Sequence, residues 1–167
     1  AACSSGQEPY SISMEIEEYR LRNPGSIVPG ERIMATDISA TILDRAKKAE
    51  YDALALNRGL PKDYLQRYFN KKSDTSWVIK DNIRRRVEFR SLNLLNNYHL
   101  MGKYDVILCR NVLIYFSNEV KLDILRRLHG ALKPGGYLFL GASEALNGLP
   151  ELYNMVHCHP GIIYQAK

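Results

Sequence analysis

Residues 104–116, YDVILCRNVLIYF, carry the strongest structural signal in the chain. Residues 106–109 are apolar and uncharged, which predicts a central β-strand covered on both faces. Arg110 and Asn111 follow at once, and Tyr115 comes shortly after them. Polar groups at the carboxyl end of a strand are where open parallel sheets bind their ligands. The alternative is that Arg110 and Asn111 only cap the next segment. The flanking sequence distinguishes this capping role from a ligand-binding role.

The composition predicts one folded domain over residues 1–167. Apolar residues make up 46% of the chain and charged residues 25%, and no apolar run approaches the length of a membrane span. The three cysteines lie far apart without a C-x-x-C pair, which indicates neither a disulfide framework nor a zinc site. The net charge of +5 allows an acidic partner but is too small to indicate a nucleic-acid-binding protein. We expect a cytoplasmic protein.

The chain opens with a loop composition. Residues 1–8, AACSSGQE, are rich in small side chains that let a backbone approach a ligand closely, and Pro9 suits the first turn of a helix. Because such a loop should follow a strand, we expect a first strand upstream of residue 1. The helix after Pro9 should end before the NPG sequence at residues 23–25. Its expected buried face consists of Ile12, Ile16 and Tyr19.

Residues 32–37, RIMATD, form the next expected strand, and Ser39 is a suitable N-cap for the helix behind it. Asp37 ends this strand. An acid at this place can accept hydrogen bonds from both hydroxyls of a ribose, as in dinucleotide-binding folds. The alternative is an Asp that hydrogen-bonds only within its own turn.

The segment between residues 51 and 90 interrupts this alternation of strands and helices. Two strand-like runs, residues 77–79 and 87–89, flank the basic run Arg84-Arg85-Arg86. We therefore expect a small inserted antiparallel β-subdomain, assigned to residues 61–90. The three arginines could meet phosphate or an acidic protein surface, but a charge run of this kind is more often a solvated face.

A helix is expected after residue 116, with Ser117 or Asn118 as its N-cap and KPGG at residues 133–136 as its stop. Its apolar spacing predicts a buried face made of Val120, Ile124 and Leu128. The basic side chains that we expect to face water are Lys121, Arg126 and Arg127.

Three more strands are expected in the second half of the chain. Residues 137–140 form one, and residues 153–156 and 162–164 should pair antiparallel around Pro160-Gly161. His157 and His159 lie beside this turn without a third well-spaced ligand, so we assign no metal site.

Candidate ligand groups follow four expected strands: residues 1–8, Asp37, Asn93 and the Arg110-Asn111 pair. In a doubly wound sheet the carboxyl ends of the strands line one edge, so these groups should converge. The sequence has neither G-x-G-x-x-G nor G-x-x-x-x-G-K-[ST], which disfavours nicotinamide cofactors and ATP. An acid for a ribose without a phosphate cradle fits S-adenosylmethionine.

Six motifs follow one another along nearly the whole chain: AACSSGQEPYS at residues 1–11, ATDI at 35–38, LNLL at 92–95, CRNVLIYF at 109–116, KPGG at 133–136 and G-x-S-E at 141–144. In composition and order they resemble the motifs of the CheR family, the chemotaxis receptor glutamate methyltransferases. Gln7 stands where many members have a second Glu, next to the position of Glu8. The resemblance implies an α/β fold of the class I, Rossmann-like methyltransferase type. This fold has a mostly parallel doubly wound sheet, a C-terminal antiparallel strand and an inserted antiparallel β-subdomain.

The same resemblance implies methyl transfer from S-adenosylmethionine to receptor glutamates, with S-adenosylhomocysteine as the product. The implied cofactor contacts are Glu8, Asp37, Asn93, Leu94, Arg110 and Asn111. Tyr115 is implied to lie near the transferred methyl group. Because a carboxylate is already nucleophilic at neutral pH, no general base is needed, and Tyr115 would position groups rather than remove a proton.

The family meets its receptors through the inserted subdomain, so cytoplasmic receptor domains are the implied partners. Members that grip a receptor's C-terminal peptide carry a glycine-bearing loop there, whereas KKSDT at residues 71–75 has no glycine. This chain therefore resembles the members that do not depend on the peptide tether. The family's helical N-terminal domain has no counterpart in the sequence. We expect neither nucleic-acid binding nor membrane insertion.

Two other functional classes remain open at this stage. A non-catalytic module that binds S-adenosylmethionine in signalling would carry the same motifs. A nucleic-acid methyltransferase is favoured only by the net charge and by Arg84, Arg85 and Arg86. It would be expected to show an N/D-P-P-[YF]-like motif where this chain has Arg110-Asn111-Val112-Leu113.

Overall fold

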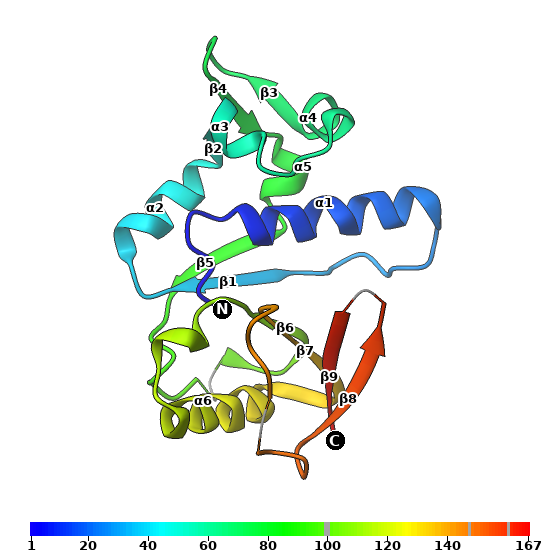
Figure 1. The fold of residues 1–167 in the computed structure, drawn as a ribbon. Helices are drawn as coiled ribbons and strands as arrows, with labels where there is room; N and C mark the ends of the chain where they lie inside the picture. Colours follow the sequence, from blue (N-terminus) through cyan, green and yellow to red (C-terminus); the bar gives the residue numbers. More distant parts are fainter. Residues whose placement is uncertain (99–100, 147, 160) are drawn as a thin grey trace. The chain divides into compact units, whose positions relative to one another are not determined.

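The computed structural model describes residues 1–98, 101–146, 148–159 and 161–167. The chain divides into two units, and each contains a pair of parallel strands together with helices (Figure 1). One unit is Cys3–Leu92, and the other combines Ala1–Ala2 with Asn93–Lys167. The α/β class with parallel strands that we expected from the sequence is confirmed.

The unit Cys3–Leu92 is organised around two parallel strands, β1 (Ile33–Asp37) and β5 (Val87–Ser91). Helices α1 (Gln7–Arg22) and α2 (Ala40–Lys48) both contact this strand pair. Helix α2 begins where expected, because the Ser39 hydroxyl accepts a hydrogen bond from the backbone N–H of Ile42. Helix α1 ends at Arg22, directly before the NPG sequence, as predicted.

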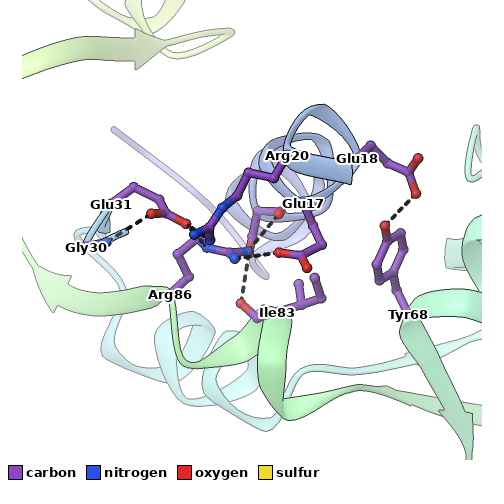
Figure 2. Close-up of polar contacts among 9 residues, drawn as sticks. Glu17, Glu18, Arg20, Gly30, Glu31, Tyr68, Ile83 and Arg86 are labelled. Carbon is purple, nitrogen blue, oxygen red and sulfur yellow. Dashed lines mark hydrogen bonds and ion pairs between the residues drawn. The ribbon is translucent and has the colours of Figure 1, made fainter. Parts of the chain in front are cut away.

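The predicted buried face of α1 is wrong. Tyr19 is 49% exposed, whereas the buried residues of this helix are Pro9, Tyr10, Ser13, Met14 and Glu18. Glu18 is buried because the Tyr68 hydroxyl donates a hydrogen bond to its carboxylate at 2.5 Å (Figure 2) and Arg67 forms an ion pair with it. Ser13 is buried because its hydroxyl donates to the Ile83 carbonyl at 2.9 Å. The buried face of α1 therefore includes two polar side chains that have hydrogen-bond partners, and the apolar spacing predicted a different face.

An antiparallel sheet of three strands follows α2, in the order β2-β4-β3 (Figure 1). Its strands are β2 (Glu50–Asp52), β3 (Phe69–Lys71) and β4 (Ser76–Ile79). The short helices α3 (Ala53–Leu56), α4 (Lys62–Tyr68) and α5 (Asp81–Arg84) accompany them. The antiparallel sheet agrees with the expectation, but the run at residues 87–89 belongs to β5 and pairs in parallel with β1. The sheet also begins earlier than residue 61. Its first strand, β2, starts at Glu50, directly after the left-handed residue Ala49 at the end of α2.

The unit that contains Asn93–Lys167 has a four-stranded sheet in the order β6-β7-β9-β8. Strands β6 (Tyr104–Cys109) and β7 (Leu132–Leu140) are parallel, and β9 (Gly161–Ala166) runs antiparallel to β7 and to β8 (Tyr153–Cys158). The predicted C-terminal antiparallel pair is confirmed. Pro160, at which we expected its turn, lies outside the described residues.

Helix α6 (Asn118–Ala131) connects β6 to β7, after a 3-10 turn η2 (Leu113–Tyr115). The Ser117 hydroxyl caps it by accepting from the Val120 N–H. Its buried residues are Ile124, Leu125, Leu128 and Ala131. The predicted cap and most of the predicted buried face are confirmed.

Strand β6 differs from the expected central strand. It lies at one end of the strand order, and Val106 is 45% exposed, although Cys109 is fully buried. The Ala1 amino group donates to the Leu108 carbonyl at 2.5 Å on this strand. A short apolar run does not distinguish a strand covered on both faces from one covered only at its end.

Candidate functional site

The N-terminal loop of the unit Cys3–Leu92 lies against the end of β1. The Cys3 N–H donates to the Thr36 carbonyl at 2.9 Å, and the Ser4 N–H donates to Asp37 Oδ2 at 2.9 Å. Ser4 and Gly6 both have positive φ, at 49° and 89°. A Cβ on Gly6 would lie 3.0 Å from the Cβ of Ala46, so glycine allows a close approach here. The small residues are thus used to fold the loop tightly.

The two carboxylate oxygens of Asp37 each accept one backbone hydrogen bond. Oδ2 accepts from Ser4, and Oδ1 accepts from the Ser39 N–H at 3.0 Å. The second bond is the contact within its own turn that we considered as the alternative. An ionised carboxylate has about four acceptor positions, so this half-buried side chain retains capacity for the two hydroxyls of a ribose. The residues present fit that part of S-adenosylmethionine.

Glu8 lies in the first turn of α1 and is half-buried. It belongs to the same unit as Asp37 and directly follows the loop that contacts Asp37. The remaining predicted site residues are in the other unit: Asn93, Leu94, Arg110, Asn111 and Tyr115. The predicted residues thus form two groups, each of which is built by its own unit.

Asn93 and Leu94 form a turn after β5. Asn93 Oδ1 accepts from the Leu95 N–H at 2.9 Å, which fixes the Asn93 side chain within the turn, and Leu94 is buried. Arg127 of α6 holds the same turn through the carbonyls of Leu95 and Asn96. The Arg127 side chain, which we expected to be available to water, is 34% exposed and also runs along the helix surface to reach these backbone oxygens.

Arg110 and Asn111 follow β6 directly, at its carboxyl end, as predicted. Asn111 has a left-handed backbone with φ 57°, a conformation that Asn adopts more readily than most residues. The turn continues into η2, which carries Tyr115 with 79% of its surface exposed. Tyr115 thus lies six residues after the end of β6, and a ligand can reach its exposed side chain from solvent.

Glu144 holds this turn, and sequence reasoning missed its role. Its Oε2 accepts from the N–H groups of Asn111 and Gly141, both at 2.8 Å. Its Oε1 accepts from the three consecutive N–H groups of Val112, Leu113 and Ile114, at 3.0, 2.7 and 3.3 Å. The only signal in the sequence was the G-x-S-E motif, which does not say what the acid contacts.

The pKa of Glu144 is lowered. Burial would raise the pKa of this carboxyl, but hydrogen bonds from the N–H groups of Gly141, Asn111, Leu113 and Ile114 stabilise its ionised form and outweigh the burial. Glu144 therefore carries a negative charge at neutral pH.

The basic run at residues 84–86 is not a uniform solvated face. Arg85 is exposed, whereas the Arg86 guanidinium forms ion pairs with Glu17 and Glu31 (Figure 2). Arg84 contacts Asp81 and the Lys47 carbonyl. Only Arg85 keeps the solvent-facing position that a docking residue needs.

A cavity of about 540 Å³ lies in the unit Cys3–Leu92, next to α1 and the segment from α3 to α4. Its aromatic lining includes Tyr10, Tyr51, Tyr64 and Phe69. Its lining contains neither Glu8 nor Asp37, so it is separate from the predicted cofactor residues of this unit.

Within the ranges that the structure describes, no group of three or more His, Cys, Asp or Glu side chains could hold a metal ion. No helix among the same residues is long and apolar enough to cross a membrane.

Residues 1–162 match the family described as CheR methyltransferase, SAM binding domain. The chain belongs to this CheR methyltransferase family. The expected family and its cofactor, S-adenosylmethionine, are therefore confirmed.

Relatives of this CheR-family chain carry names from chemotaxis. It is 63% identical over all 167 residues to the chemotaxis protein methyltransferase Cher2 of Pseudomonas putida, of which it covers 61%. It is 62% identical over the same length to chemotaxis protein methyltransferase 1 of Pseudomonas aeruginosa, again covering 61%. The chain thus spans about three fifths of the length of the curated relatives that it matches.

Solved structures similar to this chain include a DhpI complex with SAH, with a TM-score of 0.49 at 14% identity. That match covers 99% of this chain and 56% of the other. The methyltransferase domain of bacterial CtHen1 gives a TM-score of 0.48 at 15% identity, covering 83% of this chain and 53% of the other.

Proposed function

We propose that the protein transfers the methyl group of S-adenosylmethionine to glutamate side chains of chemotaxis receptors and forms glutamate methyl esters. The observation that carries this proposal is the 62–63% identity, over all 167 residues, to two chemotaxis protein methyltransferases. The proposed substrates are S-adenosylmethionine and the cytoplasmic domains of receptors. We therefore propose that the protein itself acts in the cytoplasm.

The proposed cofactor residues fall into the two groups described above. Asp37 would accept the ribose hydroxyls, supported by its two carboxylate oxygens at the end of β1. The other proposed cofactor contacts are Glu8, Asn93, Leu94, Arg110 and Asn111. The motif resemblance and the positions of these residues at strand ends and at the start of α1 support this assignment.

The chemistry that S-adenosylmethionine supplies is an electrophilic methyl group on a positively charged sulfur. The substrate carboxylate oxygen forms the new O–C bond while the S–C bond breaks, and the electron pair of that bond goes to sulfur, so no proton is moved. The protein has to hold the carboxylate in line and exclude water. Tyr115 is the proposed catalytic residue, and its exposed hydroxyl would orient the incoming carboxylate.

The proposed partner is the cytoplasmic domain of a receptor, which docks on the inserted β-subdomain. The turn at residues 71–75 lacks glycine and closes on itself through hydrogen bonds from the N–H groups of Lys72 and Ser73 to the Ser76 carbonyl. These contacts support recognition that is independent of a C-terminal peptide tether. Deleting the C-terminal tail of a receptor should then change its methylation little.

The test uses the full-length protein, purified receptor cytoplasmic domains and cofactor labelled in the methyl group. The proposal predicts a label on the receptor that is released as methanol in base, because methyl esters are base-labile. Receptor variants with Gln in place of the methyl-accepting Glu residues serve as the control. Cofactor binding without transfer would support the non-catalytic signalling module, and transfer to nucleic acid would support the third class.

A further inference from the structure

The carboxylate of Glu144 connects the ends of two neighbouring strands. Strands β6 and β7 are parallel, and their last paired residues are Cys109 and Leu140. Glu144 accepts from the Gly141 N–H just after β7 and from the Asn111 N–H just after β6, both at 2.8 Å. One side chain thereby fixes the two loops that leave this edge of the sheet.

The same carboxylate also organises the backbone up to Tyr115. Oε1 accepts from three successive N–H groups, those of Val112, Leu113 and Ile114. Successive N–H groups that point to one spot form a concave anion site, which in many proteins receives a ligand. Here the protein fills that site with its own acid, so the turn is held in place before any ligand arrives.

Gly141 shows how closely these groups approach. A Cβ at Gly141 would lie 2.5 Å from Asn111 Oδ1, 2.6 Å from Glu144 Oε2 and 2.9 Å from the Asn111 nitrogen. No residue larger than glycine fits without displacing them. The side-chain oxygen of Asn111 therefore has a defined position against the loop after β7.

We propose that Glu144 is a positioning residue for methyl transfer, which fixes Asn111 and the turn that carries Tyr115. This inference rests on the proposed function, because it deepens the role of the same site. An exposed tyrosine on a three-residue 3-10 turn has little packing of its own to orient it. Its direction depends on the backbone beneath it, and four N–H groups of that backbone end on Glu144.

The test compares wild type with Glu144→Gln in the full-length protein. The amide has nearly the same shape, but it has no charge, and its NH2 group cannot accept a hydrogen bond. We expect kcat for receptor methylation to fall about 10- to 100-fold, as for a small misplacement of a catalytic group, while KM for receptor stays within about threefold. Hydrogen exchange of the backbone at residues 111–114 should become faster at the same time.

Tyr153→Phe is the matched control for stability. The Tyr153 hydroxyl donates to the Leu125 carbonyl at 2.9 Å in the same unit, so its removal also deletes a buried hydrogen bond, but away from the turn. We expect its kcat to equal that of wild type. A Glu144→Gln protein whose kcat stays within threefold of wild type, or falls no further than that of Tyr153→Phe, overturns the proposal.

Two measurements keep the inference separate from the proposed function. If wild type methylates no receptor, the proposed function fails, but faster hydrogen exchange at residues 111–114 in Glu144→Gln than in wild type still supports the role of Glu144, and equal exchange overturns it. If Glu144→Gln does not fold, wild type and Gly141→Ala take its place: wild-type amides at residues 111–114 that exchange as fast as in an unfolded peptide overturn the proposal. Strong protection there, lost in Gly141→Ala, supports it.

Discussion

Arg86 and Glu31 form an ion pair in which Nε lies 2.8 Å from Oε1, and their side chains are only 9% and 18% exposed (Figure 2). The same guanidinium donates from Nη2 to Glu17 and from Nη1 to the backbone and hydroxyl oxygens of Ser13. Arg86 thus links the start of β5 to α1 and to the segment before β1. An arginine that looks like part of a basic run is instead a structural connection within its unit.

Replacing Arg86 by Ala should therefore destabilise the protein strongly. Removing one partner of a buried ion pair leaves the other charge without compensation, and we expect a loss of about 3 kcal/mol in the free energy of unfolding. Arg85→Ala should stay within about 0.5 kcal/mol of wild type, because Arg85 is exposed. Urea unfolding of both variants checks this, and equal stabilities would contradict the structural role of Arg86.

Among the three arginines at residues 84–86, Arg85 is therefore the one whose replacement can test receptor docking. If the basic run meets an acidic receptor surface, Arg85→Ala should raise KM for receptor by about two- to fivefold at low salt and leave cofactor affinity unchanged. The dependence of KM on added salt should also flatten, because exposed charges are screened beyond a Debye length of about 10 Å at 0.1 M. An unchanged KM across the salt series would mean that Arg85 is only solvated. Arg86→Ala is unsuitable for this test, because it changes stability.

Asp37→Asn should weaken binding of S-adenosylmethionine. The change removes a charged acceptor that we propose for the ribose, at a cost of about 1.5–3 kcal/mol, or about 10- to 150-fold in Kd. Asp52→Asn is a matched control, since Asp52 caps α3 by accepting from the Ala55 N–H at 2.8 Å and has no proposed ligand. Calorimetry that gives equal affinities for both variants would remove Asp37 from the site.

The features that the sequence predicted correctly are those set by local chemistry. Ser39 and Ser117 cap helices through their own next turn, and the NPG sequence at residues 23–25 ends α1. The polar ends of β1 and β6 were also found, since they follow directly from short apolar runs. Each of these signals lies within a few residues of the structure that it specifies.

The features that were missed depend on partners far along the chain. Glu18 lies on the buried face of α1 because Tyr68, fifty residues later, donates to it. Glu144 gains its role from N–H groups that lie about thirty residues earlier. A single sequence without pairing information contains no periodic pattern for such contacts, so spacing alone assigned α1 the wrong face.

Tyr115→Phe should lower turnover more than binding. The residue is 79% exposed, so loss of its hydroxyl should change the free energy of unfolding by less than about 0.5 kcal/mol. If the hydroxyl orients the substrate carboxylate in the transition state, kcat should fall about tenfold or more, as for the loss of one hydrogen bond worth about 1.5 kcal/mol. Calorimetry with S-adenosylhomocysteine should show unchanged affinity. An equal loss in kcat and in affinity would make Tyr115 a binding residue.

Glu144 should also give the protein a pH-dependent contribution to stability. Its pKa in the folded state lies below its ordinary value, because backbone N–H groups stabilise the carboxylate against the opposing effect of burial. The folded state therefore binds fewer protons at this group than the unfolded state does. The stabilisation is complete above the unfolded pKa of about 4.3 and is lost as the pH falls through the lower folded pKa.

Glu144→Gln lacks this stabilisation at every pH. We expect this variant to be less stable than wild type by about 1–3 kcal/mol at pH 7, with the difference shrinking steadily between pH 5 and pH 3. Tyr153→Phe removes a hydroxyl that donates to a carbonyl and no acid, so its difference from wild type should stay constant over the same range. Urea unfolding of the three proteins at several pH values measures both differences, and a Glu144→Gln difference that is equal at pH 3 and pH 7 would show that the carboxylate charge does not hold the turn.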